Sequence, residues 1–559
     1  MPIRCCFVTL GVFKRALIGG GIFLCAAGGT TAAGSDAAVA LPELLRVLVE
    51  KGVLTEDDAT AVLGEARGSS GNLNRTGEPE DGSDPVDEDV IRVPYLPDAV
   101  RDAVRDELVR ETVPDVTEQV VTELRTQAKA GSLAAVWPEW LRGLRLYGDL
   151  RYRVENIDYN GDSNAPGSVI DWQAVNGAGG VLAAGPDAFL NTTQDRFRTR
   201  LRVRLGVEAE LGEWWAAGVR LSTGNSNVPV TTNQTLGDYG NRGDILLDRG
   251  FIQYFRPVGE SQALWFSAGR MANPYQSTSL VWDADLGFEG VSTRYTHGAK
   301  DRWGQVSVTA GWFALQEQAL TTDDKSLAAL QLAGMWDLGP QAQLRAAAAY
   351  YDFSNLQARP VTTAPGTCDL ATEEQLGSVP PYLQKGNSLA AICISGTAGN
   401  PGAAEDVAKV GLASEFEVVA FTLGYDWAWD AHQGLSIDFE YATNLGFDAT
   451  EILRRTGQDL DEQVDGWHLK LALGVDTPRR LSDWSVQAGY KRIERDALVD
   501  AFTDSDFHLG GTNARGWYLS GQYGLHQDVW LSLRWISSNS IEGPTFEVDQ
   551  YFVDLSARY

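Results

Sequence analysis

Five arginines occupy every second position between residues 196 and 204. Side chains alternate across an extended strand, so all five lie on one face, while an apolar row from Leu201 to Leu211 lies on the other. A row of guanidinium groups focuses counter-ions on a wet surface. The sequence therefore predicts a basic wall made of Arg196, Arg198, Arg200, Arg202 and Arg204.

The strand expected at residues 144–156 adds three arginines to the corresponding face: Arg145, Arg151 and Arg153. A charge that faced lipid at the bilayer midplane would cost roughly 2–4 kcal/mol, so in a membrane barrel these side chains must face the lumen. Two interpretations remain open: the arginines line a pore, or nearby carboxylates neutralise some of them and they serve only solubility. Those carboxylates are Asp149, Glu155, Glu208 and Glu210. We favour a pore role for Arg151, Arg153, Arg200 and Arg202.

Cysteine chemistry is confined to two places in the chain. Cys368 and Cys393 share one long polar segment, and the other three cysteines lie near the N-terminus, at Cys5, Cys6 and Cys25. In an exported protein the first pair is expected to form a disulfide that staples a loop. A metal site needs more ligands, and no histidine is near either cysteine. We expect no metal and no cofactor.

Catalytic chemistry is not indicated by the five histidines. Hydrolysis at a barrel needs a nucleophile, a histidine base and an orienting group. The histidines are His297, His432, His468, His508 and His526, and none has a flanking serine or aspartate pattern of that kind. Each is expected to be a solvated polar residue, and the chain is not expected to be an enzyme.

Composition narrows the class of protein. The chain has 559 residues and a formal net charge of −29, which argues against nucleic acid as a partner. After the N-terminus it contains no apolar run long enough for a helical membrane span. A soluble barrel of this size would fill its interior with apolar side chains, but here the second face of the strands is polar. These features favour an antiparallel transmembrane barrel.

The spacing of the predicted strands gives their number. From residue 144 onward, alternating segments are joined by connections that are in turn long and short, as membrane barrels require. The longest connection is expected from Asp352 to about Asp406. The count comes to about sixteen strands, with an uncertainty of two at residues 406–430, and a barrel of that size leaves an aqueous channel. The last strand, Tyr551–Tyr559, should pair with the first and close the barrel.

The residues before the barrel divide into four segments. Residues 1–40 are expected to be a signal peptide, with Ala38–Ala40 as one possible cleavage site, and the bulky Leu24 disfavours lipid attachment at Cys25. Residues 41–67 have helical spacing and predict a periplasmic hairpin, and residues 68–97 form an acidic flexible linker. Residues 98–136 are an amphipathic helical segment, either solvated or a short oligomerising coil. The barrel is expected to span residues 140–559.

The third long connection is the natural element to face the arginine wall. It contains Trp282, Asp283 and Asp285 and leads to Glu289. Together with Gly269-Arg270 before it and Phe288–Tyr295 after it, this region resembles the fifth strand, inward-folded loop and sixth strand of general bacterial porins. The wider chain is similar to the "putative porin" family in several short motifs: Lys51–Thr55, Val93–Tyr95, Leu146–Arg151 and Leu247–Arg249.

The resemblance implies a trimeric diffusion channel in the outer membrane, narrowed by that loop. Asp283, Asp285 and Glu289 would then face Arg151, Arg153, Arg200, Arg202 and Arg204 across a wet constriction with weak anion preference. The expected partners are outer-membrane lipid and lipopolysaccharide, two further copies of the chain, and small polar solutes. The alternatives are a channel selective for anions, phosphate or sugar, or a structural protein tethered through the N-terminal helices. The cysteine loop and the acidic linker match no feature of that family.

Overall fold

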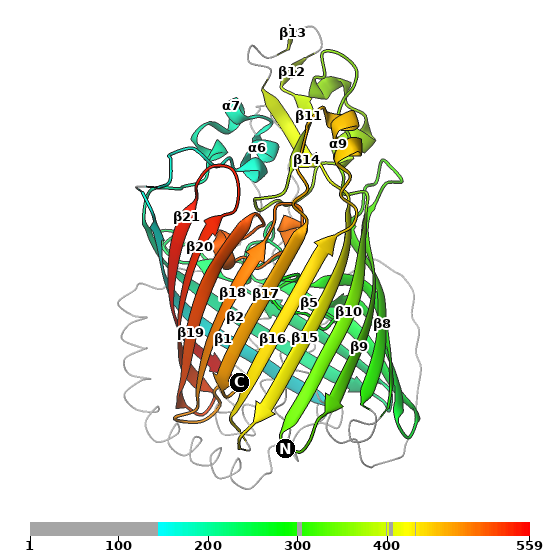
Figure 1. Ribbon diagram of the computed structural model, residues 1–559, viewed down its shortest axis with the longest axis vertical. Coiled ribbons are helices and arrows are strands. Elements are labelled where there is room, and N and C mark those ends of the chain that lie inside the picture. The colour runs from blue at the N-terminus through cyan, green and yellow to red at the C-terminus, as the bar shows by residue number, and fades with distance from the viewer. Residues whose placement is uncertain (1–142, 162, 299–303, 398–399, 402–405, 431) are drawn as a thin grey trace, which may run out of the picture. The chain divides into compact units, whose positions relative to one another are not determined.

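The computed structural model describes residues 143–559, except 162, 299–303, 398–399, 402–405 and 431. The predicted segments 1–40, 41–67, 68–97 and 98–136 lie outside the described residues. Within the described part, strands form a closed antiparallel barrel (Figure 1). Among these residues no helix has the length and apolar character needed to cross a membrane.

Sixteen long strands make the barrel wall in the described part of the chain, which confirms the predicted number. They are β1 (Leu144–Tyr159), β2 (Arg196–Leu211), β3 (Trp215–Ser222), β5 (Leu246–Gly259), β6 (Gln262–Met271), β7 (Phe288–His297), β8 (Gln305–Gln316), β9 (Lys325–Asp337), β10 (Ala342–Ser354), β15 (Phe416–Ala428), β16 (Gly434–Asn444), β17 (Asp465–Gly474), β18 (Trp484–Ile493), β19 (Ala514–His526), β20 (Val529–Ser540) and β21 (Glu547–Arg558). The two-residue β4 (Gln234–Thr235) pairs with β2.

Each strand pairs with its neighbours in sequence, and β21 pairs with β1 to close the wall. The closing register aligns Arg153 with Asp554 and Asp149 with Arg558, as expected for a last strand beside the first. Backbone hydrogen bonds between Gly148 and Tyr559 extend the pairing to the end of the chain. No long strand of the barrel is therefore left with an unpaired edge.

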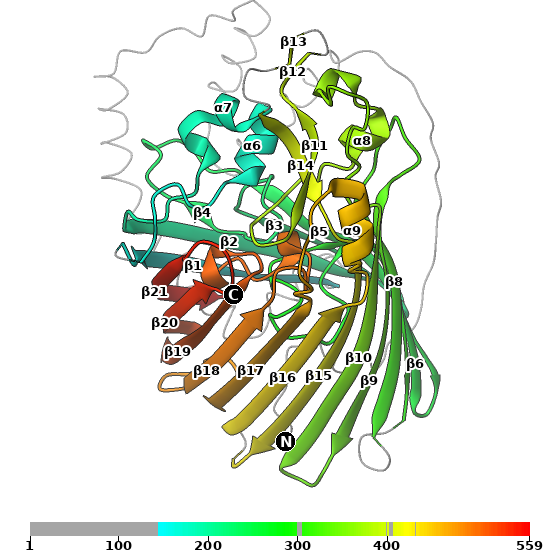
Figure 2. The same ribbon diagram turned by 45° about the horizontal axis from the view of Figure 1, so that its top comes forward.

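The long connections gather at one end of the barrel and carry small elements of their own (Figures 1 and 2). These elements are α6 (Trp172–Ala178), α7 (Val181–Ala184), η2 (Gly185–Ala188), η3 (Cys368–Leu370), α8 (Glu373–Gly377), β11 (Leu389–Ile394), β12 (Gly396–Thr397), β13 (Asn400–Pro401), β14 (Val407–Leu412), α9 (Ala449–Thr456), η4 (Asp500–Phe502) and η5 (Phe507–Leu509). A disulfide joins Cys368 and Cys393 within the longest connection.

That longest connection runs from 355 to 415, beyond the expected end at Asp406. Residues 407–412 form β14, which pairs with β11 above the barrel instead of joining the wall. The stretch 406–430 is therefore overlong for one strand because it holds part of a loop hairpin as well as β15. This difference leaves the number of barrel strands unchanged.

The largest apolar core of the described residues lies inside the upper part of the barrel. It forms where residues 272–287, the inward loop, pack against the inner wall. Leu280, Val281 and Trp282 of this loop are buried, and the Trp282 ring contacts Phe288 and Tyr351 edge-on, with centroids 5.0 and 5.1 Å apart. Burial of these side chains is what holds the loop inside the barrel.

Candidate pore constriction

Strand alternation places the arginine wall on the inner face of β1 and β2. The outer face of these strands carries exposed apolar side chains such as Leu150 and Leu205, at 42% and 45% exposure. In the register of β1 and β2, Arg151 is opposite Arg202 and Arg153 is opposite Arg200. Like charges directly opposite one another are destabilising, so this arrangement requires carboxylates between them.

Two carboxylates on β1, those of Asp149 and Glu155, each bind two successive arginines of β2. Asp149 binds Arg202 and Arg204 at 2.8 and 2.6 Å, and Glu155 binds Arg198 at 2.6 Å and Arg200 at 3.6 Å. The network therefore combines features of both interpretations of the sequence, pore lining and neutralisation by nearby carboxylates. Several arginines are neutralised by neighbouring acids, yet the side chains of Arg202 and Arg204 keep 15% and 18% of their surface exposed on the inner face.

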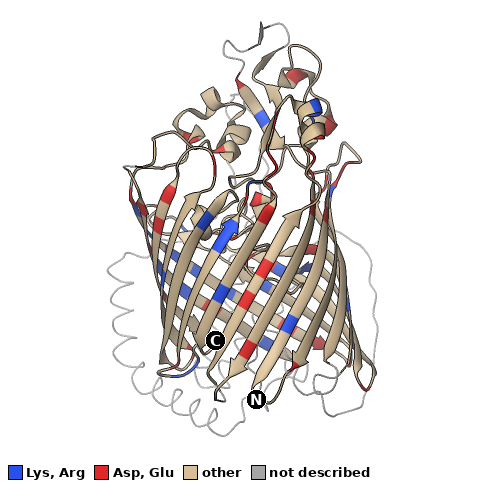
Figure 3. Cartoon of the chain, viewed as in Figure 1, with Lys and Arg blue, Asp and Glu red and all other residues tan. Residues whose placement is uncertain are grey.

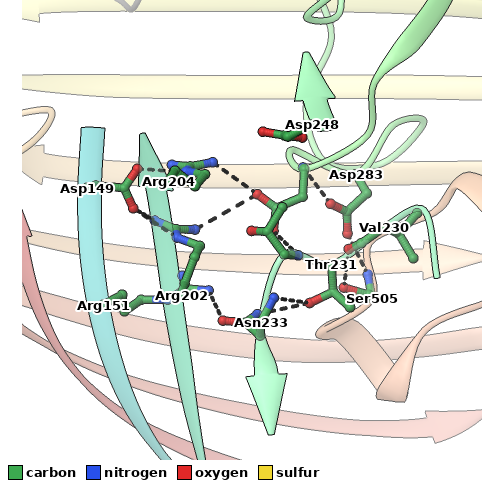
Figure 4. Close-up of polar contacts among 12 residues, drawn as sticks. Asp149, Arg151, Arg202, Arg204, Val230, Thr231, Asn233, Asp248, Asp283 and Ser505 are labelled. Carbon is green, nitrogen blue, oxygen red and sulfur yellow. Dashed lines mark hydrogen bonds and ion pairs between the residues drawn. The ribbon is translucent and has the colours of Figure 1, made fainter. Parts of the chain in front are cut away.

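The inward loop reaches this wall through Asp285. Its carboxylate lies 3.2 Å from Arg204 and 3.9 Å from Arg202, and it accepts hydrogen bonds from the backbone and hydroxyl of Thr232 (Figure 4). Burial raises the pKa of Asp285, but Arg202 and Arg204 outweigh it and hold the pKa below its usual value. Asp285 is thus an ionised group clamped between the loop and the wall.

Asp283 does not face the arginine wall as the sequence predicted. Its carboxylate accepts backbone hydrogen bonds from Asp285 and Ser505, at 2.7 and 2.9 Å (Figure 4). Within the described residues no basic side chain lies within ion-pair distance of it, and burial with the nearby Asp504 raises its pKa well above the usual value. Its role is to fold the loop tip and tie it to the loop at 494–513.

Glu289 is also misplaced by the sequence prediction, because it lies on the outer face of the barrel. β7 begins at Phe288, whose ring packs inside the barrel against Phe313. Alternation then directs Glu289 to the outer face, where its exposed carboxylate pairs with Arg270 of β6. The error came from the position of the strand start, since a shift of one residue moves a side chain to the other face.

A second inward loop, residues 494–513, was not identified from the sequence. Its Asp506 binds Arg153 at 3.0 Å and also pairs with Arg534, and its Asp504 binds Lys491 at 2.7 Å. The opposing carboxylates therefore come from two loops. The available signal was the spacing Asp504-Ser505-Asp506, which repeats the Asp283-Ala284-Asp285 pattern of the first loop.

Arg151 and Arg249 are inner arginines for which no carboxylate lies within ion-pair distance among the described residues. Arg151 donates to Asn233 Oδ1 at 2.7 Å, and its Nε is buried without an acceptor in this part of the chain. Arg249 of β5 also has a buried Nε without an acceptor among the described residues. Buried donors without acceptors are costly, which distinguishes these two guanidinium groups from the arginines that are paired with carboxylates.

The other side of the barrel carries more acid. Arg345 of β10 binds Asp426 and Asp438, at 2.7 and 2.9 Å, and Lys470 shares Asp438 at 3.2 Å. Figure 3 shows acidic positions along β15 and β16 on that side. The inner surface is thus basic along β1 and β2 and mixed or acidic along β15 and β16.

Two histidines expected to be solvated are buried instead. His468 is 1% exposed and bonds through its ring nitrogens to Thr278 of the inward loop and to Tyr518, both at 2.9 Å. His508 is 2% exposed and lies 3.1 Å from the hydroxyl of Ser538. Both histidines help to fasten inward loops to the wall, a role that their sequence neighbours do not reveal.

Bacterial outer-membrane proteins are among the solved structures to which this chain is similar. One of them is a loop-deletion mutant of OmpT, an outer membrane protein of Vibrio cholerae (TM-score 0.36, 10% identity, 74% of this chain and 99% of that chain). Others are a mutant porin of Rhodopseudomonas blastica (0.32, 10%, 74% and 100%) and the outer membrane channel DcaP of Acinetobacter baumannii (0.30, 11%, 74% and 97%). No curated protein matches the chain in sequence.

The family comparison is decisive because it covers almost the whole chain. The model of the family described as "Putative porin" matches residues 38–559, which include every barrel strand and both inward loops. The protein is therefore an outer-membrane β-barrel of porin type, and this chain belongs to the Putative porin family.

Proposed function

We propose that this protein forms a water-filled channel through which small hydrophilic solutes and ions diffuse passively. The observation that carries the proposal is the charged inner surface, on which Asp285 of the inward loop is bound to Arg202 and Arg204. Charged groups keep part of their surface exposed inside a barrel only where water reaches them. In this proposal Arg151 lies beside the constriction, and the buried Arg153 and Arg200 support the wall behind it.

The channel prefers anions in this proposal. Salt bridges neutralise much of the basic wall, but Arg151 and Arg249 lack carboxylate partners among the described residues. Fixed charges along a pore raise the local concentration of counter-ions. The acidic side at Asp426 and Asp438 gives a field across the channel, which orients dipolar solutes as they pass.

Planar-bilayer recordings of the purified full chain test both statements. The wild type should conduct, and in a salt gradient its reversal potential should have the sign of anion preference. Arg151→Gln combined with Arg249→Gln should shift that potential toward cation preference. The control is Arg454→Gln, since Arg454 lies on α9 with 72% of its side chain exposed. Absence of conductance would contradict the channel, and an unchanged reversal potential in the double variant would contradict the anion preference.

A substrate-selective anion channel is the second candidate, and the arginine row on β2 favours it. Guanidinium groups bind phosphate and carboxylate by paired hydrogen bonds, so a row of arginines provides successive binding positions for an anion. The two candidates differ in their concentration dependence. A selective channel shows chloride conductance that added phosphate or a small dicarboxylate blocks at millimolar concentration, whereas a general channel shows no such block.

We further propose export by the N-terminal signal and assembly as a homotrimer. Support comes from the family relationship and from the extended apolar outer wall of the barrel. Mass measurement of the detergent-solubilised protein tests the assembly. A mass of one chain at all protein concentrations would contradict the trimer, and an N-terminus still at Met1 in the outer membrane would contradict cleavage.

A further inference from the structure

The strap, as we call residues 383–388, is the part of the longest outer connection that packs on the second inward loop. It leads directly into β11, which pairs with β14 above the barrel (Figure 1). The Cys368–Cys393 disulfide joins cysteines that are 25 residues apart, and the strap lies inside the ring of chain that it closes. Closing such a ring removes conformational freedom from the segment within it. The strap is therefore more restricted than an open loop of the same length.

Two amide side chains of the strap bind the backbone of the second inward loop. Asn387 donates to the backbone oxygens of Arg495 and Leu498, at 2.7 and 2.8 Å. Its Oδ1 atom accepts from the backbone of Asp500 at 2.7 Å, and Gln384 donates to the backbone oxygen of Asp500, also at 2.7 Å. These bonds satisfy backbone groups of a loop whose regular structure consists of two short 3-10 turns in the described part of the chain.

Two further residues of the strap extend the contact toward both ends of the same loop. Ser388 donates from its backbone and from its hydroxyl to the carboxylate of Asp496, at 2.8 and 2.6 Å. The ammonium group of Lys385 donates to the backbone oxygens of His508 and Gly510. The strap therefore holds the loop on both sides of its tip.

The strap and the loop approach each other so closely that each carries a glycine at the contact. Gly386 of the strap has a φ of +110°, and a Cβ there would overlap the backbone oxygen of Thr512. Gly511 of the loop has a φ of +92°, and a Cβ there would overlap the backbone oxygen of Lys385. Glycine is the residue that permits both a positive φ and a close approach of two backbones. The two segments are therefore shaped for one fixed fit.

The tip of the second inward loop, Asp504–Asp506, carries the charges that reach the pore wall. Asp506 binds Arg153 at 3.0 Å and also pairs with Arg534 on the inner face of β20. Arg153 has a second acid, Asp554, whereas Asp506 is the only ion-pair partner of Arg534 among the described residues. Removal of the tip from the wall would therefore leave Arg534 as an unpaired positive charge on the inner face.

We propose that the strap positions Asp506 against the wall, so that the longest outer connection sets the width and the charge of the passage. The inference rests on the proposed channel function. Asn387 is the central positioning residue, because three hydrogen bonds to the loop converge on its side chain. When the strap is released, the second inward loop leaves the wall, the passage widens, and the charge of Arg534 is exposed to passing ions.

Planar-bilayer recordings of the purified full chain test the proposal. Asn387→Ala should raise the single-channel conductance and shift the reversal potential in a salt gradient toward anion preference. The shift should match that of Asp506→Asn, which removes the same negative charge from the wall directly. Gln384→Ala should act in the same direction, and it takes the place of Asn387→Ala if that variant does not fold.

The matched control is Asn176→Ala. Asn176 of α6 is also buried and also bonds to backbone, at 3.1 and 2.8 Å from Val410 of β14, but it joins two outer elements to each other. Its loss should leave the reversal potential at the wild-type value. The proposal is overturned if Asn387→Ala behaves like Asn176→Ala.

A double variant separates positioning from general destabilisation. Because the strap acts through Asp506, Asn387→Ala should give no further shift of the reversal potential in the Asp506→Asn background. Additive shifts would overturn the proposal. Hydrogen exchange of residues 494–513 gives a reading that needs no conduction, and it should be faster in Asn387→Ala than in Asn176→Ala. If the wild type does not conduct, the proposed function fails, and equal exchange rates in the two variants would overturn the strap as well.

Discussion

Arg153 is almost fully buried on the inner wall, with 1% exposure, although it carries a full charge. Asp554 binds it through two hydrogen bonds of 2.7 and 2.9 Å, Asp506 adds an ion pair at 3.0 Å, and the Phe552 ring lies beneath its guanidinium group. Because three elements converge on one charge, this residue fixes the position of β21 against β1 and of the second inward loop against both.

We expect Arg153→Met to destabilise the folded barrel by about 3–5 kcal/mol, because Asp554 would be left buried without an ion-pair partner among the described residues and Asp506 would keep only Arg534. Denaturant unfolding followed by tryptophan fluorescence measures the loss. The matched control is Arg454→Met, since the exposed pair of Arg454 with Glu451 should contribute less than about 1 kcal/mol. Equal stabilities of the two variants would show that the buried cluster is not a structural centre.

Asp500 is expected to make the stability of the folded barrel depend on pH. Its carboxyl group is 2% exposed at the base of the second inward loop and accepts hydrogen bonds from the backbone of Gln384 and Ala501, both at 2.8 Å. Burial raises the pKa of Asp500 to about 7, despite those hydrogen bonds and the nearby Lys385. Between the unfolded value of 3.8 and about 7, the folded chain holds a proton that the unfolded chain has lost. Stability therefore falls as pH rises through this window.

Asp500→Asn should remove that slope. The difference in unfolding free energy between wild type and variant should change by up to about 1.4 kcal/mol per pH unit between pH 5 and 7, with the wild type losing stability at the higher pH. Burial lowers the pKa of Lys385 to about 7, so Lys385 is charged in both states at pH 5–6 and opposes this slope only as the pH approaches 7. Parallel curves for the two proteins from pH 5 to 7 would contradict the assignment.

At the scale of elements, the inward loop is held by two buried aromatic side chains, Tyr275 and Trp282, and by a set of polar contacts. Trp282 is 4% exposed in the core between the loop and the wall. Thr278 donates to Glu440 Oε2 at 2.5 Å, and Lys491 donates to the backbone oxygen of Ser279 at 3.0 Å. The aromatic side chains supply burial energy, and the polar contacts fix the orientation in which Asp285 reaches the arginines.

Trp282→Ala should release the loop while leaving the barrel closed. Truncation of a buried tryptophan costs about 3–5 kcal/mol, and here the loss falls on one loop, not on the strand pairing. We expect faster proteolysis within residues 272–287 and noisier single-channel currents, with far-ultraviolet circular dichroism unchanged. Trp517→Ala, at an outward position with 61% exposure, is the control and should leave proteolysis of this loop at the wild-type rate.

The sequence was a good guide wherever one periodicity governed the outcome. Strand alternation placed Arg202 and Arg204 inside and the apolar row of β2 outside, and the long and short connections led to the correct strand number. The sequence-based predictions failed where tertiary packing determined the position of a side chain. Asp283 and Asp285 are two residues apart, yet one folds the loop tip and the other binds the wall, because their partners come from residues 505 and 202–204. Local sequence contains no record of such distant partners.

For the whole molecule, closure of the barrel depends on a glycine at the seam. Gly148 of β1 exchanges backbone hydrogen bonds of 3.0 and 3.1 Å with Tyr559, and the Tyr559 hydroxyl donates to the backbone of Arg204 at 3.0 Å. The terminal ring thus crosses β1 and reaches β2. A Cβ at Gly148 would lie 2.6 Å from the Tyr559 ring and 2.3 Å from the Arg204 oxygen, which is far inside contact distance.

Gly148→Ala should therefore loosen the seam and lower the unfolding free energy by about 1–3 kcal/mol, because the added methyl displaces the terminal ring. Thermal unfolding in detergent measures the global effect, and hydrogen exchange of residues 553–559 locates it. Gly521→Ala is the matched control: Gly521 also lies on the outer face of a barrel strand, but a Cβ there meets nothing closer than 4.0 Å. If both alanine variants melt together and exchange at the same rate, the seam does not depend on Gly148. If only Gly148→Ala exchanges faster, closure of the sixteen-stranded wall rests on the last residue of the chain packing over the first strand.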